Sequence, residues 1–272
     1  MKTTHMVFSA LLLLCNAPVT VQAGELFSDD FSSLPPRLLS APVKELTNAI
    51  QEYHYLAHRG VDTRPWQKVI CHDDAWIAGD EDGRPYLEQH TIHKMPYLWN
   101  PTMMVGDQEW SDYNVEVKVR PLLKASMAGV VFRYRTNRHY YLFGLRDGDT
   151  AFLTLRLPFE KEYRQAEWKE LATTTFEYDT DTYYNLKVEN DGARMVASID
   201  GKIVLEASDK EILKGKAGVT ANIPARFMEF SVTASDETEV EIRDRIAQRE
   251  TELESLRAQN PKPRLWRKFS VK

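Results

Sequence analysis

Hydrophobic and polar residues alternate along most of this chain, and this alternation predicts strands. The clearest run lies between Asp112 and Arg120, where every second residue is large and apolar. These apolar positions are Tyr113, Val115, Val117 and Val119. Such a pattern is typical of an antiparallel strand that buries one face. About a dozen runs of this kind, separated by Gly, Asn and Asp turns and without interleaved helices, predict an all-β sandwich or barrel.

The segment from Ala128 to Asp149 predicts two neighbouring strands of one sheet. Residues 130–134 and 139–145 are rich in β-branched and aromatic residues, and the three residues 136–138 form a connector of hairpin length. Alternation in the first strand assigns Val130, Phe132 and Tyr134 to the core face. Arg133 and Arg135 then fall on the opposite face. We expect that face to be concave and to bind the ligand.

The N-terminus has the features of a signal peptide. Lys2 precedes an apolar run from Val7 to Leu14, and Val21-Gln22-Ala23 is a small-x-small cleavage site. The run is shorter than the roughly 20 residues that span a bilayer. We therefore expect residues 1–23 to be removed, the mature chain to be secreted or periplasmic, and no membrane span to remain.

Two stretches have helical rather than strand periodicity. Residues 42–56 place apolar side chains at helical spacing and predict one N-terminal helix inserted before most of the strands. Residues 237–260 are rich in Glu, Arg, Gln and Leu without Gly or Pro, and predict a solvated C-terminal helical extension. Residues 261–272 read as a linker, as the start of a further domain, or as a frayed tail. The sandwich itself would then occupy residues 24–236.

Charge and cysteine content narrow the classes of function. The formal net charge of −5 gives no basic stripe for nucleic acid, which we therefore do not expect as a partner. Removal of the signal peptide leaves Cys71 as the one remaining cysteine, so no intrachain disulfide can form. Stability must then come from the core or from a bound metal.

Several short motifs occur in an order that resembles a known family. They are Phe27–Phe31, Trp110-x-Asp112-Tyr113, Gly129–Tyr134 followed by Tyr140–Phe143, Asp200-Gly201 and Gly215–Val219. This succession resembles concanavalin A-like jelly rolls of the laminin-G-like kind. It is similar to the 3-keto-disaccharide hydrolase family and to modules attached to polysaccharide-degrading enzymes. Residues 52–56 and 260–266 resemble modules that precede rhamnogalacturonan-lyase-like propellers.

The resemblance implies a two-sheet antiparallel jelly-roll sandwich over about Leu26 to Ala234, with a concave face that handles carbohydrate. We expect a binding or accessory module of a polysaccharide-degradation system. The alternative is a glycoside hydrolase, similar to the 3-keto-disaccharide hydrolases, that acts in the concave cleft; a structural sandwich that mediates protein contacts is a third reading. Whether the chain is an enzyme stays open, because no pair of carboxylates on predicted strands stands out. The alternating acids Glu237, Glu239 and Glu241 fall in the predicted helix.

Candidate site residues follow from side-chain chemistry and from the resemblance. Aromatic rings stack on sugars and planar donors bind their hydroxyls, so the ligand-binding candidates are Trp99, Arg133, Arg135, His139 and Tyr141. Trp66 and Trp76 fit either a sugar platform or the core, and the core is favoured. The resemblance implies Asp29 and Asp30 as calcium ligands, with Glu229 at the position of a further acid. Carboxylate oxygens suit calcium.

Overall fold

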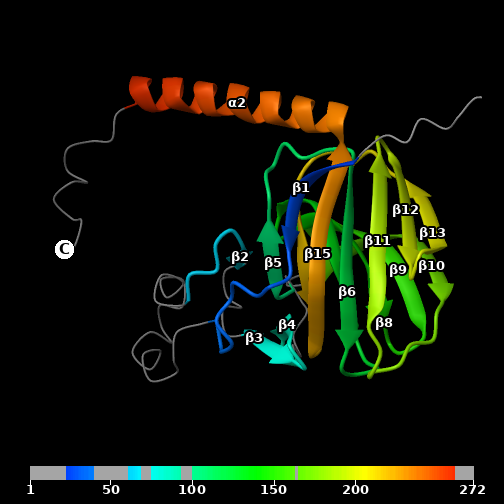
Figure 1. Cartoon of the computed structure of the whole chain (residues 1–272). Coiled ribbons are helices and arrows are strands. Elements are labelled where there is room, and N and C mark those ends of the chain that lie inside the picture. The colour runs from blue at the N-terminus through cyan, green and yellow to red at the C-terminus, as the bar shows by residue number, and fades with distance from the viewer. Residues whose placement is uncertain (1–22, 40–60, 69–74, 93–99, 163–164, 261–272) are drawn as a thin grey trace, which may run out of the picture.

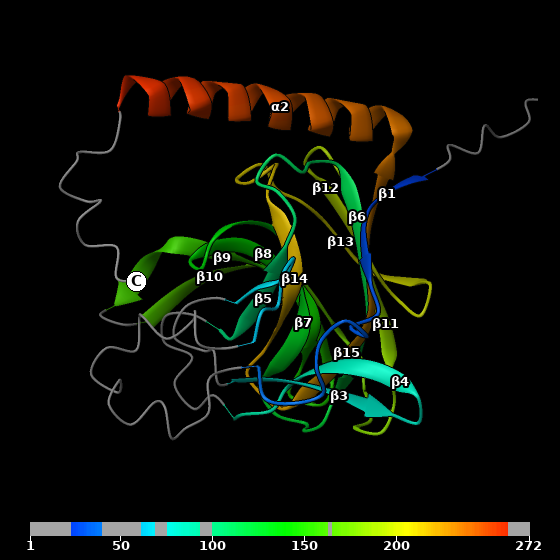
Figure 2. The same cartoon turned by 60° about the vertical axis from the view of Figure 1, so that its left-hand side comes forward.

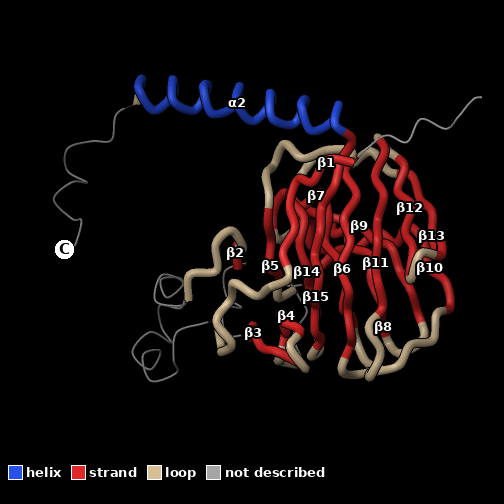
Figure 3. The backbone as a smooth tube through the Cα atoms, viewed as in Figure 1, coloured by secondary structure: helices blue, strands red, loops and turns tan. Residues whose placement is uncertain are grey.

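The computed structural model describes residues 23–39, 61–68, 75–92, 100–162 and 165–260 (Figure 1). These residues form strands β1 to β15 and the helix α2. Every strand pairing is antiparallel, and the strands form two sheets that lie face to face (Figure 3). The all-β sandwich predicted from the sequence is therefore confirmed. The predicted N-terminal helix at 42–56 lies outside the described residues, as do residues 1–22 of the predicted signal peptide.

One sheet, which we call sheet A, has eight strands. Its order is β13 (Lys202–Ser208), β12 (Arg194–Ile199), β11 (Tyr184–Asp191), β6 (Tyr113–Pro121), β15 (Ala225–Ser235), β4 (Arg84–Gln89) and β3 (Trp76–Glu81), with β1 (Ala23–Asp29) also paired to β15. Sheet B has seven strands. Its order is β10 (Gln165–Thr175), β9 (Thr150–Glu162), β8 (His139–Arg146), β7 (Met127–Thr136), β14 (Lys216–Ala221), β5 (Thr102–Val105) and β2 (Gln67–Lys68).

The main core fills the space between the two sheets. In β6, all four apolar residues predicted to face inward have no exposed surface, and the polar residues between them are partly exposed. Alternating residues of β8, among them Tyr141 and Phe143, contribute from sheet B. The backbones of β7 and β8 pass closely at Gly129. A Cβ there would lie 2.2 Å from the carbonyl oxygen of Phe143 on the neighbouring strand.

Strand β7 contains a β-bulge that reverses the facing of its last residues. The register with β8 shifts between Phe132 and Thr136, and Arg133 has a φ of 49°. An extra residue in a strand moves every later side chain to the other face. Tyr134 therefore stacks on Tyr140, at 5.6 Å between ring centroids, outside the main core. The predicted facing of Arg133 and Tyr134 is wrong for this reason.

A second apolar cluster lies on the face of sheet B that points away from the main core. We call this the outer face of sheet B. Its buried members are Met104, Met127, Val131, Tyr140, Leu142 and Phe152. Because Tyr141 and Phe143 point into the main core, their neighbours Tyr140 and Leu142 must point outward. Sheet B is thus apolar on both faces over its central strands.

Helix α2 (Asp236–Gln259) continues directly from β15. The Ser235 side chain caps its first turn by accepting a hydrogen bond from the Thr238 amide, and acidic residues follow in that turn. The helix crosses one end of the sandwich (Figures 1 and 2), and its C-terminal part extends beyond the sheets in the view of Figure 1. Ile242 is its buried anchor. In the part of the chain that the structure describes, no helix combines the length and apolar character needed to cross a membrane.

Candidate functional site

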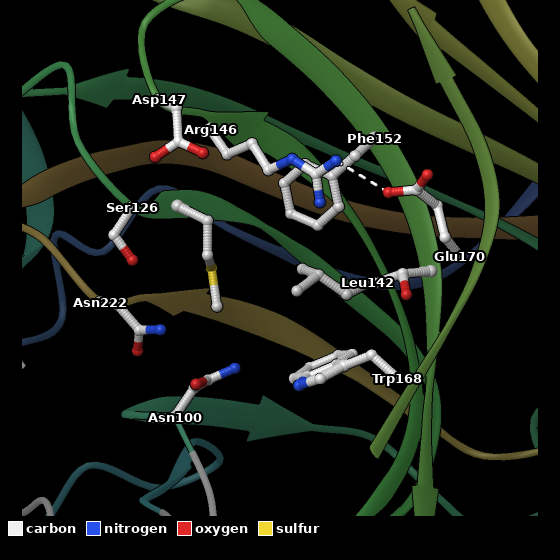
Figure 4. Close-up of a pocket in the computed structure, with 11 residues that line it drawn as sticks. Asn100, Ser126, Leu142, Arg146, Asp147, Phe152, Trp168, Glu170 and Asn222 are labelled. Carbon is white, nitrogen blue, oxygen red and sulfur yellow. Dashed lines mark hydrogen bonds and ion pairs between the residues drawn. The ribbon is translucent and has the colours of Figure 1, made fainter. Parts of the chain in front are cut away.

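A pocket of about 440 Å³ opens on the outer face of sheet B, where β7 begins and β8 ends (Figure 4). Its floor is apolar and consists of Met127, Leu142 and Phe152, all members of the outer cluster. Its walls come from the segments before β5 and after β14, from β9 and from the edge strand β10. We call this the sheet-B pocket. Ligand sites commonly combine such an apolar floor with a few placed polar groups.

Trp168 forms one wall of the sheet-B pocket. It stands on β10, which is the edge strand of sheet B, and 36% of its surface is exposed. The Tyr140 ring meets it edge to face, with 5.9 Å between centroids, and the Arg156 guanidinium lies 5.8 Å from the indole centroid. These contacts hold the indole while leaving part of it open to a ligand.

An ion pair lies opposite Trp168 across the pocket (Figure 4). Arg146 Nη2 donates to Glu170 Oε2 at 2.8 Å, and the guanidinium lies over the Phe152 ring at 5.0 Å. Asp147 follows Arg146 in the turn after β8 and is exposed. Asp147 and Gly148 have φ values of 56° and 93°, as the predicted Asp-Gly turn requires. The turn therefore presents a carboxylate at the rim of the pocket.

Two buried asparagines complete the lining. Asn100 Nδ2 donates to the Tyr140 hydroxyl at 3.2 Å, and burial raises the pKa of that tyrosine, so its hydroxyl stays protonated. Asn222 directly follows β14, and its backbone amide donates to the Met127 carbonyl. Only 5% of Asn222 is exposed, yet its Oδ1 has no hydrogen-bond partner among the described residues. A buried acceptor without a donor is costly.

Arg133 does not reach the outer face. It has no exposed surface, its Nη2 donates to the Gly192 carbonyl at 2.6 Å, and its Nη1 donates to the Ile212 carbonyl at 3.2 Å. Burial lowers its pKa, and the nearby tyrosine and aspartate side chains oppose that effect. The expectation that Arg133 sits on the ligand-facing surface is wrong, because the bulge turns its side chain inward.

The other described candidates also lie away from the sheet-B pocket. Tyr141 is buried in the core, where its hydroxyl donates to Asp209 Oδ1 at 2.6 Å. Arg135 is exposed and donates to the Gln108 carbonyl, while His139 Nε2 lies 3.4 Å from Glu211 Oε1. Trp99 lies outside the described residues. The structure thus brings together a different set of residues from the one predicted.

The predicted calcium ligands Asp29 and Asp30 already accept hydrogen bonds from backbone amides and from a tryptophan side chain. Asp29 accepts from the Phe31 amide at 2.7 Å and from Trp66 Nε1 at 2.6 Å, and Asp30 accepts from the Ser32 amide. Glu229 pairs with Lys118 at 2.5 Å. No group of three or more His, Cys, Asp or Glu side chains in the described ranges is placed to hold a metal. Asp29, Asp30 and Glu229 line one pocket, and calcium binding there stays a prediction.

Trp66 and Trp76, which the sequence assigned either to a sugar platform or to the core, belong to the core. Trp66 and Trp76 are 1% and 0% exposed. Trp168 was not predicted as a site residue, although the residues beside it in the sequence indicate an exposed ring. It stands between Glu167 and Lys169 in a run of charged residues, and an isolated aromatic among charges points to an exposed ring.

The fold and the pocket define the class of this protein: a two-sheet antiparallel sandwich with an aromatic and polar pocket on one outer sheet face. Neither a family model nor a curated protein matches the chain. Solved structures do match, and one of them is the carbohydrate-binding module CBM66 from Bacillus subtilis. It is 17% identical with a TM-score of 0.48, over 61% of this chain and 94% of that module.

Two further solved structures are similar over most of their own length. A galectin-like protein of unknown function from Bacillus subtilis is 13% identical with a TM-score of 0.44, over 79% of this chain and 100% of that one. Domain 4 of AbnA, a GH43 extracellular arabinanase from Geobacillus stearothermophilus, is 12% identical with a TM-score of 0.42, over 59% and 75%. All three TM-scores are below 0.5, so the fold assignment rests on the sheets described above.

Proposed function

We propose that this protein is a glycan-binding sandwich and that the sheet-B pocket holds the sugar. The observation that carries the proposal is the position of Trp168, a partly exposed indole held at the edge of a pocket that also contains two buried asparagines. A sugar ring has an apolar face of C–H groups and a periphery of hydroxyls. An indole suits the first, and side-chain amides suit the second.

The setting of the pocket supports the same proposal. An apolar floor excludes water beneath a ligand, which strengthens polar contacts at the walls. The predicted signal peptide supports a secreted or periplasmic location, where polysaccharides are available. We propose a binding or accessory role in polysaccharide degradation; hydrolysis of a bound glycan remains the alternative that the same assays test.

The test is to screen the mature protein, from Gly24 onward, against plant and microbial oligosaccharides, for affinity and for released sugar. Replacement of Trp168 by Ala should weaken binding by about 1–2 kcal/mol, or roughly 5–30-fold, because the stacking surface is lost. Fluorescence or calorimetric titration would measure this. The control is Ile203→Ala, which removes an exposed apolar side chain from β13 of sheet A. Unchanged affinity in Trp168→Ala would exclude this pocket, and sugar release would favour the hydrolase.

A further inference from the structure

The sheet-B pocket is lined by more carboxylates than cations. Among the described lining residues, Arg146 is the cation, and Asp147 and Glu170 are carboxylates. Carboxylic acids of this kind are ionised at neutral pH in water. The lining therefore has an excess of negative charge. A ligand with its own carboxylate would bring a third negative charge into a small space.

Arg146, the cation of the lining, already forms an ion pair. Arg146 Nη2 donates to Glu170 Oε2 at 2.8 Å, and its guanidinium plane rests against Phe152 at 5.0 Å. A carboxylate is recognised best by a guanidinium that is free to donate two parallel hydrogen bonds. The remaining N–H groups of Arg146 can reach a ligand carboxylate only beside Glu170, whose negative charge repels it. The ion pair thus acts against acidic sugars.

Two side chains of the pocket lining offer acceptors to a ligand. Asn222 Oδ1 is buried and has no hydrogen-bond partner, and its residue lines the pocket beside Met127. The Asp147 carboxylate at the rim accepts only. Hydroxyl groups can donate to both of these acceptors, whereas an ionised carboxylate on the ligand has no hydrogen to donate. A ligand that carries hydroxyl groups can therefore donate hydrogen bonds to both of these acceptors.

We infer that the sheet-B pocket selects sugars without a carboxylate and rejects uronic acids, with Asn222 and Asp147 as acceptors for sugar hydroxyls. This inference rests on the proposed glycan-binding function and names the class of ligand. The acceptors attract neutral hydroxyl-rich rings, and the carboxylates repel their C6-oxidised counterparts. Selectivity then comes from attraction and repulsion together.

The experiment uses pairs of oligosaccharides that differ only at C6. Mannotetraose and tetramannuronate form one such pair, and cellotetraose and its C6-oxidised form another; an array of matched neutral and acidic oligosaccharides extends the set. Calorimetric titration of the mature protein should give at least about ten-fold tighter binding of the neutral member, which corresponds to about 1.4 kcal/mol. The preference should shrink at high salt, because ions screen charge repulsion.

Two variants separate the parts of the inference. Asp147→Asn keeps the shape but removes one negative charge, so it should narrow the difference between neutral and acidic members by raising affinity for the acidic one. Asn222→Ala removes the buried acceptor and should weaken binding of the neutral member by about 2–10-fold, the range for one hydrogen bond. Circular dichroism and thermal melting confirm that each variant is folded.

The outcomes distinguish this inference from the function on which it rests. If acidic members bind as well as or better than neutral ones, and Trp168→Ala weakens both, the pocket is a glycan site but the inference about charge is overturned. If an Asp147→Asn variant leaves the preference unchanged, the assignment of Asp147 is overturned. If no oligosaccharide in the array binds, the proposed function falls, and this inference falls with it.

Discussion

Arg133 is a buried cation that the protein satisfies with backbone carbonyl groups. Its guanidinium donates to the carbonyls of Gly192 and Ile212, and its backbone amide donates to the Tyr113 hydroxyl at 2.6 Å. These three partners belong to β6, to the turn after β11 and to the segment after β13. Arg133 therefore ties the end of β7 to three separate parts of the chain. The bulge that directs it inward is a structural feature of the sandwich.

We expect Arg133→Ala to destabilise the fold. Hydrogen bonds to a charged group contribute about 1.5–3 kcal/mol each, and the two carbonyls would lose their donor, so the free energy of unfolding should fall by about 3 kcal/mol. For a chain of this size, the melting temperature should then drop by roughly 6–12 °C. Differential scanning calorimetry measures this, and exposed Arg135→Ala is the control. A melting temperature equal to that of the wild type would contradict the structural role.

Helix α2 is attached to the sandwich by one buried apolar residue and two arginines. Ile242 is 2% exposed. Arg245 donates to Ser111 Oγ at 2.8 Å, and Arg249 donates to Asp107 Oδ2 at 2.8 Å. The spacing from 242 to 245 to 249 puts these side chains on one face of the helix. After Arg249 the helix side chains are mostly exposed, in agreement with its extension past the sheets (Figure 1).

The contribution of the Asp107–Arg249 pair should depend on pH. Burial would raise the pKa of Asp107, but hydrogen bonds from Arg249 and from the Glu109 amide outweigh it and hold that pKa below its ordinary value. The contribution is therefore complete above the unfolded-state pKa, about 3.9, and is lost as the pH falls through the lower folded-state pKa.

A double-mutant cycle with Asp107→Asn and Arg249→Gln measures that contribution. The coupling energy should be about 0.5–1 kcal/mol at pH 7, since both side chains are partly exposed. It should be nearly unchanged at pH 4 and should decline at pH 3. The exposed pair Arg194–Glu206 is the control and should show less coupling. A coupling that grows on acidification would show that the pair does not act in this way.

At the level of the whole molecule, Asp209 links the two sheets at one side of the sandwich. It follows β13 of sheet A and accepts from Tyr141 of β8 at 2.6 Å and from Lys169 Nζ of β10 at 2.6 Å, both in sheet B. Its side chain is 5% exposed. Burial would raise the pKa of Asp209, but the bonds from Lys169, Tyr141 and the Glu211 amide outweigh this and lower it.

We expect Asp209→Asn to lower the free energy of unfolding by about 1 kcal/mol at pH 7, because the ion pair with the half-exposed Lys169 is lost. Because the folded-state pKa is depressed, wild-type stability should fall as the pH drops from about 5 through that pKa, and the variant should lose less over the same range. Urea unfolding at pH 7 and at pH 3 compares the two. Parallel losses in both proteins would show that Asp209 does not carry the acid sensitivity.

Much of the architecture follows from local sequence. Alternation in β6, β11 and β12 identifies their buried residues because the side-chain period of a strand is two residues. The Asp-Gly turns and the helix at the C-terminus also depend on neighbours in the chain, and α2 lies within a residue or two of the predicted bounds. These features were predictable because short-range sterics and hydrogen bonding determine them.

The site was decided by the tertiary structure. The lining of the sheet-B pocket is contributed by segments around residues 100, 126, 142–154, 168 and 222, and no local pattern brings these together. A single positive φ at Arg133 reverses the facing of the residues after it, and alternation cannot reveal such a bulge because it depends on pairing with β8 and β14. The chain thus encodes its strands, turns and helix locally. The position of Arg133 and the meeting of Trp168 with Asn100 and Asn222 arise only when distant strands pair.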